Sequence, residues 1–143
     1  MNDNSFTTTI TVDQTPEQAF AAINDVRRWW TGVIDGPSDM LGGEFTYRYK
    51  DIHASKQKVT ELVPGRKVVW TVTDSALQFV EHKDEWTGTK VVFDIVRKGD
   101  KTEIRFTHVG LVPNFDCYNA CSKGWTQLIH SIGTLIASKE QPA

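Results

Sequence analysis

The chain has 143 residues, of which 16 are basic and 18 acidic, so its formal net charge is −2. This length suits one domain, and the near-neutral charge without a basic stripe argues against nucleic-acid binding. No apolar run approaches the roughly 20 residues that a membrane-spanning helix needs. Because the N-terminus also lacks the features of a signal peptide, we expect a cytoplasmic protein without a membrane span.

The first 43 residues predict one strand, two short helical pieces and a loop. Threonines alternate with apolar side chains over residues 6–12, a pattern typical of a half-solvated strand. Thr15 and Gln18 have the spacing of a capping box around Pro16, which predicts a helix start. Residues 26–30 predict a second helical piece, in which at most one of Trp29 and Trp30 is fully buried on a given face. Residues 31–43 hold four glycines and a proline, which predicts a loop.

The middle of the chain predicts a run of antiparallel strands. Clear apolar alternation marks residues 44–50, where Phe45, Tyr47 and Tyr49 share one face. Further strands are predicted at residues 55–63 and 67–73, with a short one at 77–80 and a charged turn at 82–85.

The last two predicted strands, residues 89–97 and 102–109, form the clearest hairpin. With Gly99 and Asp100 as the two loop residues, the register follows by counting. It pairs Ile95 with Ile104, Phe93 with Phe106, Val91 with His108, and Asp94 with Arg105. The register places apolar side chains opposite each other and pairs one acidic with one basic residue, and both features support it.

Residues 115–139 predict one long amphipathic helix. Its apolar stripe comprises Phe115, Tyr118, Cys121, Trp125, Leu128, Ile129, Ile132, Leu135 and Ile136. Gly124 and Gly133 each cost roughly 1 kcal/mol relative to alanine inside a helix, which suggests a close approach of the sheet or a ligand. Cys117 and Cys121 are interpreted as buried thiols, because a disulfide within one helix is geometrically poor.

The predicted order places helices on one face of an antiparallel sheet, which is an α+β arrangement. A curved sheet around one helix leaves room for an apolar cavity between them, the usual form of a small-molecule site. The predicted ligand-binding residues are Tyr47, Trp70, Phe93, Phe106, His108, Tyr118, Trp125 and Leu128. For each aromatic residue singly, simple core packing is the competing interpretation.

His108 is the candidate for chemistry, since the hairpin register points it inward. A neutral imidazole there could anchor a ligand or act as a general base. The alternative is a structural histidine that bonds Tyr118 or a backbone carbonyl. The acids of the same hairpin, Asp94 and Glu103, point outward, so the residues provide no partner carboxylate. No catalytic residue, metal site or cofactor is therefore predicted.

Several motifs resemble a bacterial START-like domain of the SRPBCC superfamily. They are Trp86-Thr87-Gly88-Thr89, the run from Thr107 to Pro113, Gly124-Trp125, the segment from Thr15 to Phe20, and Trp29-Trp30. The subgroup it resembles is related to the C-terminal domain of the activator of the heat-shock-protein-ninety ATPase. The resemblance implies a helix-grip fold, in which six to seven curved strands wrap around the C-terminal helix with a hydrophobic tunnel between them. It covers nearly the whole chain, so residues 1–143 are expected to form a single START-like domain.

The leading hypothesis is a binding protein for a small hydrophobic or amphipathic ligand, either lipid-like or aromatic. One alternative is an enzyme of the cyclase or hydrolase type that uses the inward His108. The other is an interaction protein, a chaperone partner or stress-response adaptor, with a protein partner or a second copy of itself. This last hypothesis predicts an exposed apolar patch around residues 34–41.

Overall fold

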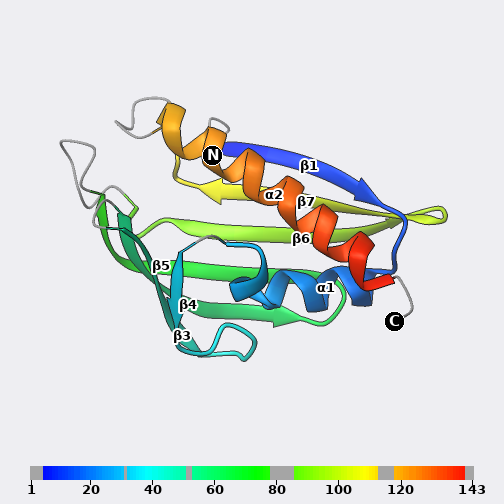
Figure 1. Cartoon of the computed structure of the whole chain (residues 1–143), viewed down its shortest axis with the longest axis horizontal. Helices are drawn as coiled ribbons and strands as arrows, with labels where there is room; N and C mark the ends of the chain where they lie inside the picture. The colour runs from blue at the N-terminus through cyan, green and yellow to red at the C-terminus, as the bar shows by residue number, and fades with distance from the viewer. Residues whose placement is uncertain (1–4, 31, 51–52, 78–85, 113–117, 141–143) are drawn as a thin grey trace.

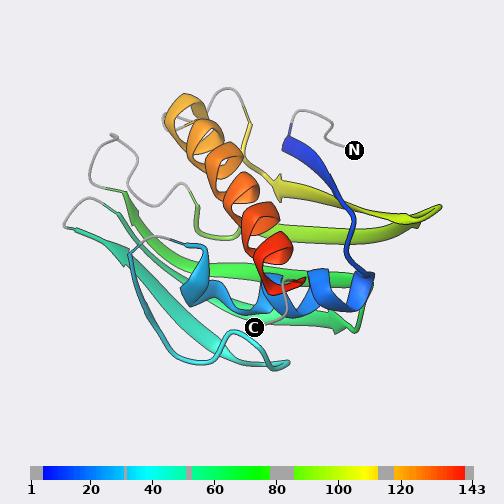
Figure 2. The same cartoon turned by 45° about the vertical axis from the view of Figure 1, so that its right-hand side comes forward.

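The structure is a computed structural model that describes residues 5–30, 32–50, 53–77, 86–112 and 118–140. Within these ranges, seven strands form one antiparallel sheet in the spatial order β1-β7-β6-β5-β4-β3-β2. The long helix α2 and the shorter α1 lie on the same face of the sheet (Figure 1), and the sheet curves around them, as Figure 2 shows. The predicted α+β, helix-grip fold is therefore confirmed. The elements in chain order are β1 (Phe6–Val12), α1 (Pro16–Asn24), η1 (Val26–Arg28), β2 (Val33–Asp35), β3 (Glu44–Tyr49), β4 (His53–Val63), β5 (Lys67–Leu77), β6 (Lys90–Lys98), β7 (Lys101–Val109) and α2 (Tyr118–Glu140).

The predicted start of α1 is confirmed in detail. The Thr15 hydroxyl accepts a hydrogen bond from the Gln18 backbone N–H at 3.1 Å, and the Gln18 side chain accepts one from the Thr15 N–H at 2.9 Å. Pro16 stands at the first helical position, where its missing N–H has no intrahelical partner to lose. Ala19, Ala22 and Ile23 form the buried face of the helix.

Two of the predicted element boundaries are corrected. Residues 31–43 were predicted as a loop, yet they contain β2, which pairs with β3 and buries Ile34. A strand of three residues is too short to show alternation, and the glycines around it mask it. β5 extends to Leu77, beyond its predicted end at residue 73, because a bulge in its pairing with β4 shifts the register between Lys56 and Gln57. The predicted turn at residues 82–85, and all but the first residue of the short strand at 77–80, lie outside the described residues.

The predicted register of the β6–β7 hairpin is confirmed at every pair. Ile95 lies opposite Ile104, Phe93 opposite Phe106, and Val91 opposite His108. Gly99 has φ +63, a left-handed conformation that glycine adopts without steric cost. Turn and strands thus specify the same register, which fixes the inward direction of His108.

The apolar stripe of α2 is also confirmed. Cys121, Trp125, Ile129, Ile132 and Ile136 are buried, while Tyr118, Leu128 and Leu135 are partly buried against the core. Phe115 and Cys117 lie outside the described residues. A Cβ on Gly133 would meet Ile10 Cδ1 at 3.4 Å, so the expected close approach is real at this glycine.

Both tryptophans that follow α1 are buried, which corrects the expectation that at most one could be. Trp29 is 3% exposed and Trp30 is 4% exposed. Their rings are nearly parallel, at 7° with centroids 5.9 Å apart, and both stack on Trp70. The short 3₁₀ helix η1 ends at Arg28, so the two residues do not follow the α-helical spacing on which the expectation depended.

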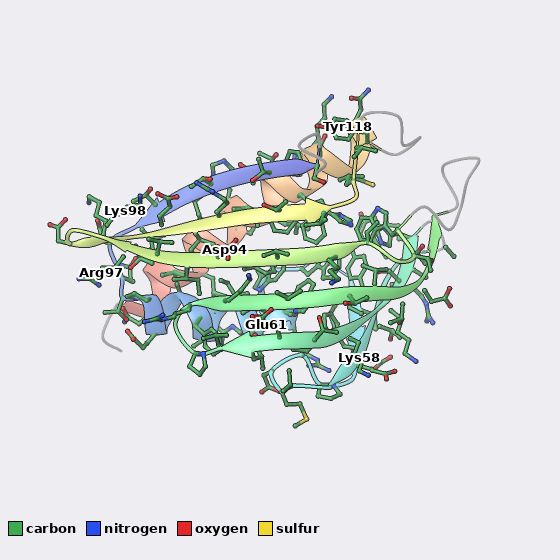
Figure 3. All side chains as sticks on the ribbon, turned by 180° about the vertical axis from the view of Figure 1, so that it is seen from behind. Lys58, Glu61, Asp94, Arg97, Lys98 and Tyr118 are labelled. Atoms are coloured by element: carbon green, nitrogen blue, oxygen red, sulfur yellow. The ribbon has the colours of Figure 1, made fainter. Side chains whose placement is uncertain are left out.

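The outer face of the sheet is polar. Lys58, Glu61 and Arg97 are exposed there, as Figure 3 shows. Within the described ranges, none of the helices combines the length and the apolar character that crossing a membrane would require.

Candidate functional site

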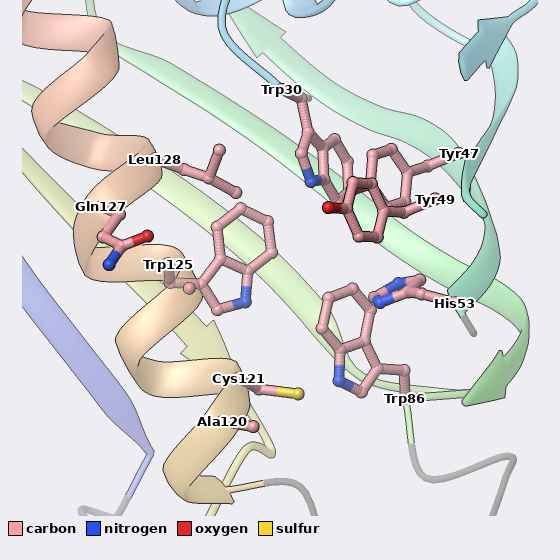
Figure 4. Close-up of a pocket in the computed structure, with 11 residues that line it drawn as sticks. Trp30, Tyr47, Tyr49, His53, Trp86, Ala120, Cys121, Trp125, Gln127 and Leu128 are labelled. Carbon is pink, nitrogen blue, oxygen red and sulfur yellow. The ribbon is translucent and has the colours of Figure 1, made fainter. Parts of the chain in front are cut away.

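A cavity of about 200 Å³ lies between the N-terminal half of α2 and the strands β3 and β4. Figure 4 shows its lining side chains, which come from the sheet, from α2, from the second residue after η1 and from the turn before β6. They are Trp30, Tyr47, Tyr49, His53, Trp86, Ala120, Cys121, Gly124, Trp125, Gln127 and Leu128. Five of the eleven are large aromatics, and none carries a carboxylate, ammonium or guanidinium group.

The aromatic walls of the cavity hold one another in place. Trp30 stacks on Tyr47 with centroids 4.0 Å apart and 13° between the planes. Trp125 contacts Trp30 at 5.2 Å and stacks on Trp86 at 5.7 Å and 16°. Because Trp30, Tyr47, Trp86 and Trp125 each contact at least two other rings, this part of the cavity wall is set in advance of any binding.

Gly124 leaves open the side of the cavity that α2 forms. A Cβ built on this residue would meet nothing within 4 Å. The expectation that the sheet approaches closely here is therefore wrong, and the alternative, a ligand beside Gly124, stays a prediction. What the glycine does instead is widen the cavity by the volume of the missing side chain.

The turn that carries Trp86 is fixed by its own backbone. The Thr89 N–H donates to the Trp86 carbonyl at 3.0 Å, and Gly88 between them has φ +89. This is the pattern of a type II turn, which needs a residue with positive φ at its third position. The Gly88 N–H also donates to the Val72 carbonyl at 2.8 Å, which ties the turn to β5.

His108 lies behind the cavity wall and makes hydrogen bonds with both ring nitrogens. Trp125 Nε1 donates to His108 Nδ1 at 3.1 Å. Since an indole N–H can only donate, Nδ1 carries no proton and the neutral ring carries its proton on Nε2. Nε2 then donates to Thr89 Oγ1 at 2.8 Å, and that hydroxyl donates to the Trp86 carbonyl at 2.6 Å.

This chain of hydrogen bonds joins the two tryptophans that stack on each other in the wall. Each group in it donates to the next, from the Trp125 indole N–H to the Trp86 backbone carbonyl. His108 is therefore a structural histidine, as the alternative interpretation held, but its partners are Thr89 and Trp125 rather than Tyr118 or a backbone carbonyl.

Both histidines are neutral near neutral pH. Burial, and to a smaller extent the charge of nearby His53, lower the pKa of His108 to about 3. Burial also lowers the pKa of His53 to about 4. His53 lies edge-on between Tyr47, at 5.0 Å and 89°, and Trp86, at 4.7 Å and 85°. The eleven described residues that line the cavity therefore carry no charge above about pH 5.

The structure divides the eight predicted site residues into three groups. Tyr47, Trp125 and Leu128 line the cavity. His108 is fully buried behind it, and Tyr118 lies on the first turn of α2, partly buried against the core. The remaining three are packed in the core without lining the cavity: Trp70, Phe93 and Phe106.

Eight of the eleven lining residues were not predicted as site residues, and His53, Trp86 and Gly124 are among them. His53 pairs with Tyr49 across β3 and β4, but the strand was predicted to begin two residues later. Trp86 was noted within its Trp-Thr-Gly-Thr motif, and the positive φ of Gly88 explains that motif. Within the described ranges, no three side chains of metal-binding type come together.

A curved antiparallel sheet that holds a long terminal helix against an aromatic cavity defines a START-like, helix-grip protein. Within this class, the chain belongs to the family of Activator of Hsp90 ATPase homolog 1-like proteins, whose profile matches residues 13–137. The resemblance inferred from the sequence motifs is thereby confirmed. No curated protein sequence gives a significant match.

Solved structures with similar folds support the assignment. The Aha1 dimer from Colwellia psychrerythraea is 23% identical, with a TM-score of 0.76 over 92% of this chain and 95% of that one. The Mll3558 protein from Rhizobium loti is 19% identical, with a TM-score of 0.70 over 91% of this chain and 94% of that one. At these identities the likeness establishes the fold alone.

Proposed function

We propose that the cavity binds one small, planar and mostly apolar molecule. The observation that supports this function is the preformed space of about 200 Å³ with five aromatic rings in its walls. An engineered apolar cavity of about 150 Å³ holds benzene, whereas drug-sized ligands occupy roughly 300–1,000 Å³. The size therefore favours an aromatic ring with substituents over a long acyl chain, and so the aromatic over the lipid-like form of the hypothesis.

Replacing Gly124 by leucine is expected to abolish binding while leaving the fold intact. The new side chain would extend into the cavity without a collision at its Cβ. Removal of a glycine from the helix interior should also stabilise the protein by about 0.5–1 kcal/mol. Binding of small aromatic probes such as acetophenone would be followed by NMR titration and by the fluorescence of the tryptophans in the wall.

The matched control is Lys123→Leu, which adds the same side chain one position away, at an exposed residue that does not line the cavity. This control should bind like the unmodified protein. Equal binding by Gly124→Leu and Lys123→Leu would place the ligand elsewhere and contradict the proposal.

The geometry of the site provides no observation that supports the enzymatic alternative. The hydrogen bonds to Trp125 and Thr89 use both nitrogens of His108, so the ring could accept a substrate proton only after the Trp125 bond had broken. Among the described residues, no carboxylate lines the cavity beside it.

A second function, protein contact, is supported by one surface feature. Met40 and Leu41 are adjacent in the segment between β2 and β3, and they are 54% and 66% exposed. Ile34, at the start of the predicted patch, is buried instead. Exposed neighbouring apolar side chains are a common feature of interfaces, and a relative with the same fold is described as a dimer. We propose that Met40 and Leu41 take part in a homodimer.

The double substitution Met40→Ser and Leu41→Ser is expected to shift a dimer toward the monomer by at least about tenfold in dissociation constant. Sedimentation velocity over a range of concentrations would measure the shift. Val96→Ser removes an apolar side chain that is 45% exposed on β6 and serves as the control. An unmodified protein that stays monomeric at every concentration would refute the homodimer.

A further inference from the structure

The Trp86 indole nitrogen is a buried donor without a partner. Trp86 is 3% exposed, and its Nε1 has no hydrogen-bond acceptor in the part of the chain that the structure describes. Most buried polar groups in folded proteins are bonded, and leaving one unbonded carries a free-energy cost. An exception in the wall of a cavity points to an acceptor that the protein chain does not itself supply.

The position of this nitrogen matches a ligand contact. Figure 4 shows the nitrogen edge of Trp86 turned toward α2, on the side of Cys121, and both residues line the same cavity. The type II turn and the Thr89 hydroxyl hold the Trp86 backbone, and the Trp125 and His108 rings pack against its indole. The donor is therefore fixed in direction before a ligand arrives, which lowers the entropic cost of binding.

The surroundings also decide what charge the acceptor can carry. Among the described residues that line the cavity there is no lysine or arginine, and burial keeps the His53 ring neutral near neutral pH. A carboxylate would lose its hydration there without gaining a counter-ion, which is costly. A neutral oxygen loses much less hydration and gains the indole hydrogen bond.

We propose that the natural ligand is a neutral planar aromatic molecule whose carbonyl or comparable oxygen accepts a hydrogen bond from Trp86 Nε1. This proposal rests on the proposed binding function and adds to it the chemical class of the ligand and the residue that selects it. Trp86 is a specificity-determining residue: its ring forms part of the wall for any apolar guest, whereas its N–H distinguishes guests that carry an acceptor.

The test uses three probes of nearly equal size and shape. Acetophenone has a neutral carbonyl, α-methylstyrene replaces that oxygen by a methylene group, and benzoate replaces the methyl ketone by a carboxylate. Dissociation constants would be measured by NMR titration near neutral pH for the unmodified protein and for Trp86→Phe. The substitution keeps an aromatic wall and removes the N–H. A single hydrogen bond corresponds to roughly tenfold in affinity.

Trp86→Phe is expected to weaken acetophenone binding about tenfold more than it weakens α-methylstyrene binding, and benzoate should bind most weakly to the unmodified protein. The matched control is Trp70→Phe, since Trp70 Nε1 is also buried without an acceptor but does not line the cavity. This control should affect acetophenone and α-methylstyrene equally.

Three failures can be told apart. If α-methylstyrene and acetophenone both bind but Trp86→Phe weakens them by the same factor, the inference about Trp86 is wrong and the binding function stands. If benzoate binds most tightly, the requirement for a neutral ligand is wrong. If none of the three probes binds to the unmodified protein, the proposed function itself fails.

Discussion

Acidification from about pH 7 to about pH 5 is expected to lower the free energy of unfolding by roughly 4 kcal/mol through two histidines alone. His108 is fully buried and His53 is half-buried, and burial lowers their pKa values from the ordinary 6.5 to about 3 and about 4. One pKa unit corresponds to about 1.4 kcal/mol, so near pH 5 each ring contributes a loss of about 2 kcal/mol.

The sign follows from which state binds the protons. Below pH 6.5 the imidazoles of the unfolded chain become protonated, while the folded chain keeps both rings neutral until the pH approaches about 4 for His53 and about 3 for His108. The unfolded state therefore binds more protons in this window and gains stability as the pH falls. The contribution is fully present above the unfolded pKa and is lost progressively below it.

Urea unfolding at both pH values would measure this loss. His53→Phe keeps an aromatic ring between Tyr47 and Trp86 but removes one titrating group, so it should reduce the loss by about half. Burial is the main cause of the lowered pKa of both rings. Added salt should therefore change the loss of unfolding free energy on acidification only a little. The assignment would be refuted if His53→Phe lost as much stability on acidification as the unmodified protein.

The sequence was sufficient to predict the layers of the fold and the register of its last hairpin. Alternation in β6 and β7 assigned Phe93, Phe106 and His108 to the inner face, and the Gly99 turn fixed their pairing. These predictions succeeded because they depend on local rules, namely the period of two in a strand and the backbone of a two-residue loop.

The candidate site was harder to predict because strand periodicity does not distinguish a core position from a cavity position. Phe93 and Phe106 face inward and pack edge to face at 5.3 Å, with Trp125 lying 4.5 Å from Phe106. Tyr47 and His53 face the same side but lie on β3 and β4, next to the space that Gly124 leaves open. Which inward residue borders free space depends on where α2 crosses the sheet, and this crossing is set by packing over the whole chain.

Trp125→Phe is expected to lower the free energy of unfolding by about 3 kcal/mol, of which the lost hydrogen bond accounts for the larger part. Trp125 is 2% exposed, and its Nε1 is the donor that satisfies His108 Nδ1. Phenylalanine would keep most of the ring contacts but leave Nδ1 buried without a partner. The hydrogen bonds from His108 to Thr89 and from Thr89 to Trp86 would then lose the donor that fixes their direction.

Trp70→Phe provides the comparison that separates the hydrogen bond from the ring. Trp70 is fully buried, as Trp125 nearly is, and it packs on Phe45 and Phe93 at 5.1 and 5.2 Å. Its Nε1 has no acceptor in the protein, so the substitution removes an unbonded donor together with some ring volume. These effects oppose each other, and we expect a net cost of about 1 kcal/mol or less.

Denaturant unfolding of the two variants at one pH would measure the difference, which should be about 2 kcal/mol. A volume effect alone predicts nearly equal costs, since the two rings are almost equally buried. Equal costs would mean that the Trp125–His108 hydrogen bond contributes little to stability. In that case ring packing alone would hold the wall of the cavity. The direction of the His108 hydrogen bonds would make no contribution to the free energy of unfolding.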